Sequence, residues 1–186
     1  GLKKYGGDLA IGAFGIVNRL VFIVVMIVMG LNQGMQPIAG YNFGAKLYGR
    51  VNKVLRLTII YATAVTTFGF LVGMLVPDLV VGIFTSDAEL TELSVTGLRI
   101  TVMFFPIIGF QMVTSNFFQS IGMAGKAIFL SLTRQMLILL PCLLVLPQFF
   151  GVAGVWYSMP VSDLLASLIA LVMLVCQFRK FRTSPL

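Results

Sequence analysis

Residues 30–56 read GLNQGMQPIAGYNFGAKLYGRVNKVLR, so an apolar run enters a glycine-rich polar stretch that is followed at once by basic residues. This pattern is typical of a helix that leaves a membrane and turns at its surface. The rest of the chain agrees, because 59% of all residues are hydrophobic, 10% are charged and the mean hydropathy is +1.02. Water-soluble domains have about a quarter of their residues charged, so the composition predicts an integral membrane protein.

The same composition disfavours several other classes of protein. The net charge of +7 would suit a nucleic acid, but the basic residues stand in short groups between apolar runs rather than along one polar face. The chain has no histidine, and no cluster of cysteine and carboxylate residues falls at one depth. We therefore expect no nucleic acid partner, no enzyme activity, no metal site and no cofactor.

The long apolar runs predict the number of membrane spans. A bilayer core about 30 Å thick needs about 20 mostly apolar residues in a helix. Runs of that length predict an all-α, polytopic integral membrane bundle of about five transmembrane helices, with Pro77 as a break near the end of the second. The expected spans are residues 9–35, 57–84, 93–121, 127–146 and 152–178.

The charges of the connecting loops predict the orientation in a cell membrane. Every other loop is basic, and basic loops face the cytoplasm, which puts the C-terminus inside and the acidic loop at residues 85–92 outside. Lys3 and Lys4 oppose this orientation, but their weight is small if more membrane chain precedes them. The odd number of spans and the abrupt start at Gly1 predict an absent upstream helix, so the chain is expected to be a fragment.

Three charged residues stand out deep inside the predicted spans, where a charge needs a partner or a purpose. Asp163, Arg19 and Arg134 lie about 16 to 20 Å from the outer face at a helical rise of about 1.5 Å per residue. All three are therefore expected at one level. They are candidates for a buried ion pair that locks helices together, or for an ion-coupling site in which Asp163 exchanges a cation or a proton for substrate.

The third span has a mixture of polar, aromatic and methionine side chains. Such a mixture suits a cavity for flat lipophilic cations, but the polar groups would equally serve hydrogen bonds between helices. Both interpretations stay open. The candidate cavity residues are Phe110, Gln111, Met112, Ser115, Asn116 and Gln119.

The stretch from Gly15 to Ala45 resembles a helix of the multidrug and toxic compound extrusion family, the MATE transporters. The stretches FFQSIGMAGKA (117–127), SLTRQ (131–135) and GVAGVWYSMPVSDLLA (151–166) follow in the order that is expected of that family. The resemblance rests above all on the pattern QPxxGxNxGA, which is formed by Gln36, Pro37, Gly40, Asn42, Gly44 and Ala45.

The resemblance implies that residues 1–186 are part of one transmembrane lobe and correspond to helices eight to twelve of a twelve-helix, two-lobe transporter. The missing N-terminal lobe, the preceding helix and the lipid bilayer would then be partners. The implied function is secondary active efflux of small amphipathic or cationic compounds in exchange for Na⁺ or H⁺. Some family members use an acidic residue on helix ten. Residues 93–121 contain no acidic residue, which leaves the identity of the coupling ion open. The glycine-rich signature loop, with Gln36 and Asn42 satisfying freed backbone groups, is expected to be structural.

Two alternatives remain beside efflux. A flippase for lipid-linked precursors would need several arginines in its cavity for anionic headgroups, and this chain offers Arg19, Arg99 and Arg134. A genuinely five-span product would instead suggest a membrane scaffold subunit that does not transport.

Overall fold

The computed structural model describes residues 2–183, and its side chains from residue 7 to residue 182. Lys3 and Lys4 therefore lie outside the described side chains. All elements in this range are helical. They are α1 (Leu2–Gly44), α2 (Tyr48–Leu75), α3 (Pro77–Gly82), α4 (Ala88–Thr101), the 3-10 turn η1 (Val102–Phe104), α5 (Phe105–Ser120), α6 (Ala124–Leu132), the π-helical segment η2 (Thr133–Leu139), α7 (Leu140–Phe150) and α8 (Val152–Thr183).

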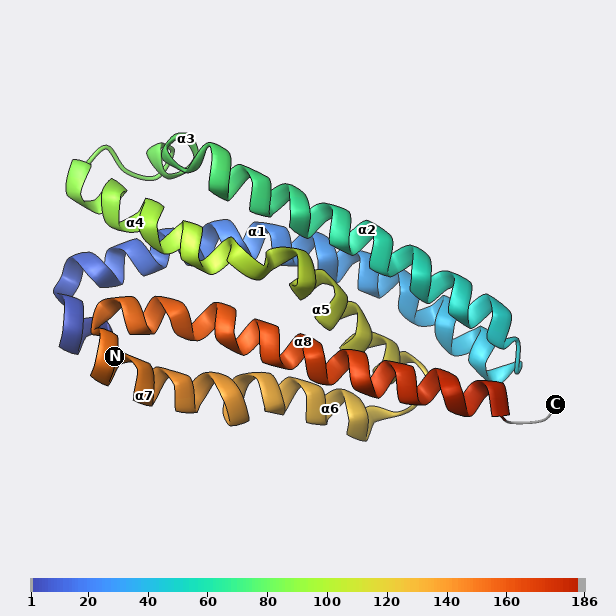
Figure 1. The fold of residues 1–186 in the computed structure, drawn as a ribbon. Coiled ribbons are helices and arrows are strands. Elements are labelled where there is room, and N and C mark those ends of the chain that lie inside the picture. Colours follow the sequence, from blue (N-terminus) through green and yellow to red (C-terminus); the bar gives the residue numbers. More distant parts are fainter. Residues whose placement is uncertain (1, 184–186) are drawn as a thin grey trace.

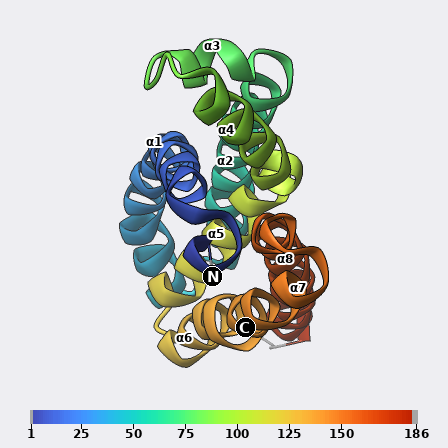
Figure 2. The same ribbon diagram turned by 90° about the vertical axis from the view of Figure 1, so that its left-hand side faces the viewer.

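Five helical stretches of the described chain are long and apolar enough to cross a membrane, which confirms the predicted all-α membrane bundle. They run side by side along one axis (Figure 1). In the view along that axis, α5 passes through the middle, between α1 and the pair formed by α7 and α8 (Figure 2). The five stretches are Gly7–Gly44, Tyr48–Leu75, Ala88–Ser120, Ala124–Phe150 and Val152–Arg182.

The two ends of the bundle carry opposite charges. The turns at 45–47 and 121–123 and the end of α8 lie at one end, whereas α3, the 83–87 loop and Gly151 lie at the other (Figure 1). The first end contains the basic residues that were assigned to the cytoplasm, and the second contains Asp87, Glu89 and Glu92. We call them the basic end and the acidic end.

Two apolar clusters fill the interior. The cluster nearer the basic end includes Val28, Met35 and Phe117, and the cluster nearer the acidic end includes Val17, Leu98 and Trp156. Helix α1 contributes to both clusters, and α5 packs against α1, α2, α6 and α8. Close packing of these side chains, rather than their removal from water, holds the bundle together, because lipid tails are as apolar as the interior.

The glycine-rich signature segment is helical, so its prediction as a turn is wrong. Helix α1 continues through Pro37 to Gly44, beyond the expected end at residue 35, and the turn follows at Lys46 with φ of 59°. Gly40 is needed for packing instead of for a bend, since a Cβ there would lie 2.9 Å from the carbonyl oxygen of Ser120. Close approach of α1 to α5 is therefore what this glycine permits.

The second and third spans also differ from the predicted boundaries. Helix α2 begins at Tyr48, so Arg50, Lys53 and Arg56 lie on its first turns rather than in a loop, and it ends at Leu75. Pro77 starts the separate helix α3, because proline cannot donate to the preceding turn. The third span begins at Ala88. The side chain of the preceding residue, Asp87, caps it by accepting a hydrogen bond from the Leu90 amide at 2.8 Å. The 3-10 turn η1 interrupts this span before Pro106.

Candidate functional site

An ion pair inside the bundle joins Arg134 of η2 to Asp163 of α8. The Asp163 Oδ1 atom lies 2.8 Å from Nη2 and 2.9 Å from Nε of Arg134. The Asp163 side chain is 5% exposed, whereas that of Arg134 is 34% exposed. This is the only salt bridge among the described side chains. A carboxylate so placed keeps its charge at low cost only while a cation is beside it.

The backbone around Arg134 is irregular, and α8 compensates for it. Residues Thr133–Leu139 form a π-helical segment in which the Leu140 amide donates to the Gln135 carbonyl, one residue further back than in an α-helix. Pro141 follows directly and has no amide hydrogen to donate. The Ser162 hydroxyl donates to the Arg134 carbonyl at 3.0 Å. Neighbouring residues of α8 thus hold both the side chain and the carbonyl of Arg134.

The ion pair lines a cavity of about 200 Å³, which we call the polar cavity. Five helical elements contribute to it, and its polar lining residues are Asn18, Thr101, Arg134, Ser162 and Asp163. Val21, Phe105 and Met112 are among the apolar residues that complete its wall. Charged, amide and hydroxyl groups therefore converge on one space inside an otherwise apolar bundle.

Arg19 does not join the other two charges, so the expectation that all three meet is wrong for this residue. Its side chain is exposed and it forms no ion pair with Asp163. Its neighbour Asn18 lines the polar cavity instead. Residue counting predicts depth in the membrane, but successive helical residues point about 100° apart, so the direction of Arg19 around α1 was not predicted.

Most of the expected polar residues of the third span line two further cavities. Gln111, Met112, Ser115 and Asn116 line one of about 350 Å³, together with Arg134. Gln119 and Ser115 line another of about 310 Å³. Met112 and Arg134 also line the polar cavity, so the three spaces adjoin one another along α5. Phe110 lines none of these three and packs against the apolar cluster near the basic end.

The same residues also make hydrogen bonds between helices, as the second interpretation expects. The Gln36 Nε2 atom donates to Asn116 Oδ1 at 3.0 Å, which ties the signature segment of α1 to α5. Ser115 Oγ lies 3.4 Å from Ser131 Oγ. Asn42 Nδ2 donates to the Ile38 carbonyl at 2.8 Å, while Pro37 and Gly44 lie within and at the end of α1. The signature residues thus make structural contacts.

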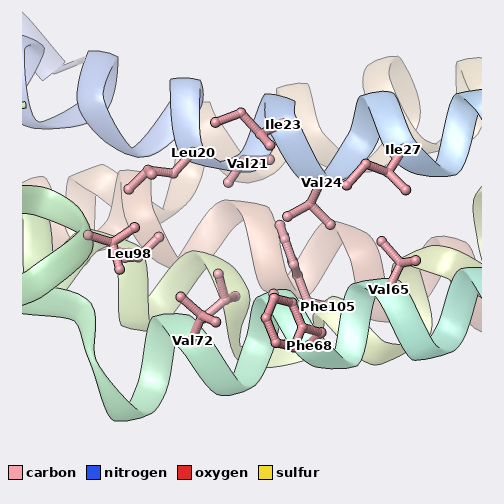
Figure 3. A pocket seen from close by; sticks show the side chains of 13 residues that line it. Leu20, Val21, Ile23, Val24, Ile27, Val65, Phe68, Val72, Leu98 and Phe105 are labelled. Carbon is pink, nitrogen blue, oxygen red and sulfur yellow. The ribbon is translucent and has the colours of Figure 1, made fainter. Parts of the chain in front are cut away.

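A second kind of cavity lies on the other side of α1, and the sequence interpretation missed it. This apolar cavity has a volume of about 210 Å³ and lies between α1 and α2. Figure 3 shows Leu20, Val24 and Ile27 of α1 facing Phe68 and Val72 of α2 across it. The only sequence signal was the close pair Gly69 and Gly73, where the absence of side chains on α2 leaves room for Val24, Val102 and Phe105.

No group of three or more histidine, cysteine, aspartate or glutamate residues that could hold a metal ion occurs in the described part of the chain. Asp163 supplies the one carboxylate that lines the polar cavity, and the oxygen atoms around it are neutral. Ser162 and Thr101 supply hydroxyl groups in the same cavity, and Asn18 supplies an amide oxygen. Oxygen ligands of this kind suit hard cations.

Comparison with known proteins adds three findings. The family model MatE matches residues 2–144. The multidrug export protein MepA of Staphylococcus aureus (strain MSSA476) is 28% identical over 165 residues, which cover 89% of this chain and 36% of that protein. MepA of Staphylococcus saprophyticus is 24% identical over the same coverage.

Solved structures show the same fold. The MATE multidrug transporter DinF-BH in complex with R6G has a TM-score of 0.85 and 37% identity, and the match covers 98% of this chain and 41% of that one. An outward-facing MATE family transporter of the MOP superfamily has a TM-score of 0.90 at 18% identity. The chain thus spans well under half of the length of the relatives that it matches.

Proposed function

Because the chain belongs to the MatE family, we propose that it forms part of a secondary active exporter that expels small amphipathic or cationic compounds in exchange for Na⁺ or H⁺. Members of this family are membrane transporters and not enzymes. The observation that carries the proposal is the polar cavity, in which the buried carboxylate of Asp163 faces hydroxyl and amide groups inside an apolar bundle. The names of the relatives, multidrug exporters, support the same class of substrate.

The ion pair supplies a mechanism for coupling. A proton or a sodium ion that binds Asp163 competes with Arg134 for the carboxylate, because both need the same negative charge. Loss of the pair frees the Arg134 guanidinium in the polar cavity and removes one of the two polar contacts described between α8 and η2. The π-helical segment and Pro141 then form a point at which the helix from Ala124 to Phe150 bends. Binding of the cation is thereby linked to the shape of the cavity.

Asp163→Asn tests this function in the complete natural gene product. We expect efflux of a fluorescent cation from vesicles, driven by an imposed Na⁺ or H⁺ gradient, to fall at least tenfold, since the amide cannot exchange a cation. Asp78→Asn is the matched control, because Asp78 is exposed at the acidic end. Wild-type efflux by Asp163→Asn at normal expression would remove Asp163 from the mechanism. Separate Na⁺ and H⁺ gradients identify the coupling ion.

The proposal includes partners beyond this chain. We expect an N-terminal lobe and a preceding helix, since the chain corresponds to 36% of MepA and 41% of DinF-BH. The intact mass of the natural product, detected through its C-terminal segment in isolated membranes, tests this. A mass well above twice 20.3 kDa supports a two-lobe exporter, and a mass near 20.3 kDa favours the scaffold alternative.

The orientation in the cell membrane belongs to the same proposal. The basic end, with the C-terminus, is assigned to the cytoplasm by the positive-inside rule. A cysteine-reactive reagent that does not cross membranes tests it on a cysteine introduced at Thr85 of the acidic end. Labelling in intact cells supports the orientation, and protection in intact cells contradicts it.

The flippase alternative receives less support. Of Arg19, Arg99 and Arg134, only Arg134 lines the polar cavity, whereas the other two side chains are exposed. A single arginine that is already paired with Asp163 provides little positive charge for an anionic headgroup.

A further inference from the structure

The apolar cavity and the polar cavity lie back to back and share part of their walls. Val21 of α1 and Phe105 of α5 line both. On α1, the adjacent residues Val24 and Val25 face different cavities, Val24 the apolar one and Val25 the polar one. The two spaces therefore lie at the same level of the bundle and are separated by a wall one side chain thick at these points.

The apolar cavity reaches the apolar outer surface of the described bundle. Its lining includes Ile23, Ile27 and Phe68, which are each more than half exposed. All of its lining residues are apolar or glycine. Where lipid covers this surface, a compound dissolved among acyl chains reaches the cavity without passing through water.

The wall between the cavities is built from irregular backbone. Phe105 is 2% exposed and follows the 3-10 turn η1, and Pro106 comes next, with no amide hydrogen to donate. On α2, Gly69 and Gly73 let the neighbouring side chains approach closely, since a Cβ at Gly73 would lie 2.8 Å from Val102. The buried Phe105 ring thus stands between the two cavities, next to the irregular backbone of η1.

We infer that the apolar cavity is a side entrance from the bilayer, through which lipophilic cations reach the polar cavity, with Phe105 as the gate. This rests on the proposed function. The occupant is an organic cation whose charge is spread within a hydrocarbon body, because such a cation dissolves in a bilayer and fits an apolar lining. Rotation of the Phe105 side chain opens the wall, and on the other side the cation takes the place of Arg134 beside the carboxylate of Asp163. Hydrophilic cations do not dissolve among acyl chains and do not use this entrance.

Plugging the apolar cavity tests the inference. Val72 lines the cavity, and the series Val72→Leu, Val72→Phe and Val72→Trp fills it with larger side chains. In the complete gene product in vesicles, we expect export of tetraphenylphosphonium to fall with side-chain size, to at least fivefold below wild type for Val72→Trp. Export of methyl viologen, a hydrophilic dication, should stay within twofold. Leu71→Trp is the matched control, because Leu71 is exposed on the same helix and does not line the cavity.

Methyl viologen export by the same variants also reports folding, so lost selectivity is distinguishable from lost protein. Equal export of tetraphenylphosphonium across the series, or a parallel fall for both compounds in Val72→Leu, overturns the entrance. The same result for Leu71→Trp as for Val72→Trp also overturns it, since lipid-facing bulk would then explain the effect. Asp163→Asn separates this failure from failure of the proposed function: it should abolish export of both compounds whether or not the entrance exists.

Discussion

The two sides of α1 illustrate how one apolar helix serves two unlike environments. Val24 faces a cavity that contains no charged residue, and Val25 faces a cavity that contains Arg134 and Asp163. Apart from Asn18 on the polar side, the residues that α1 contributes to the two cavities are all aliphatic. The difference comes from the partners, which are α2 on one side and η2 with α8 on the other. The character of a cavity in this bundle is thus set mainly by the helices that α1 meets.

Breaking the ion pair should produce the largest change. Arg134→Met leaves the carboxylate of Asp163 buried without a cation, and we expect a loss of about 3–5 kcal/mol in the free energy of unfolding. The double variant Arg134→Met/Asp163→Leu should recover most of it, because neither charge remains. Thermal unfolding in detergent measures both. An equal loss of unfolding free energy in the single and double variants would show that packing of these two side chains, rather than their charge, stabilises the contact between η2 and α8.

A carboxylate placed on either side of α1 tests the contrast directly. Val24→Asp should destabilise the protein by about 2.5–3.5 kcal/mol, since the apolar cavity offers an anion no partner. Val25→Asp should cost less, because the amide of Asn18 and the hydroxyl groups of Thr101 and Ser162 line the same cavity. Both valines are partly buried, so the pair is matched. Similar unfolding temperatures for the two variants would contradict the difference between the cavities.

A methyl group beside Val102, which lines the apolar cavity, should have a moderate effect. Gly73→Ala places a Cβ 2.8 Å from Val102, whose branched side chain adapts poorly. We expect destabilisation of about 1–3 kcal/mol. Gly30→Ala serves as the control, since its Cβ would meet nothing within 4 Å, and it should be neutral or stabilising. The same unfolding measurement compares them, and a tolerated Gly73→Ala would mean that the wall moves easily.

The smallest predicted effect concerns the hydrogen bond from the Ser162 hydroxyl to the Arg134 carbonyl. Ser162→Ala removes the donor to the Arg134 carbonyl, which should cost about 0.5–1.5 kcal/mol. Amide hydrogen exchange should increase in residues 133–139, where the backbone is π-helical. Ser158→Ala is the control, because that hydroxyl donates to Gly154 of its own helix. Unchanged exchange in Ser162→Ala would show that η2 does not depend on α8.

The main features of the fold followed from hydropathy, whereas the boundaries did not. Five spans were predicted because length and apolar content are properties of consecutive residues. The signature segment was wrongly predicted as a turn, because its glycines and Pro37 break isolated helices but are tolerated where a neighbouring helix packs closely. Gly40 against Ser120 is such a contact, and it joins residues that are far apart in the chain.

The structure brings two of the three predicted charges together and leaves the third apart. Asp163 and Arg134 lie at one level and meet, but Arg19 at a similar depth points away from them. Among the residues of the third span, Gln111, Met112, Ser115 and Asn116 line a cavity, and Phe110 does not. A position around a helix axis depends on small differences in helix rotation, which residue counting does not include.

Hydropathy and charge along the chain are enough to predict the solvent, the helical class, the number of spans and the separation of basic from acidic ends. These properties are sums over neighbouring residues, and a bilayer selects on such sums. Only the tertiary structure decided that Ser162 and Asp163 hold a π-helical Arg134, and that Val21 and Phe105 separate a polar cavity from an apolar one. Those contacts join helices that are distant in sequence, and their geometry depends on the rotation and spacing of packed helices.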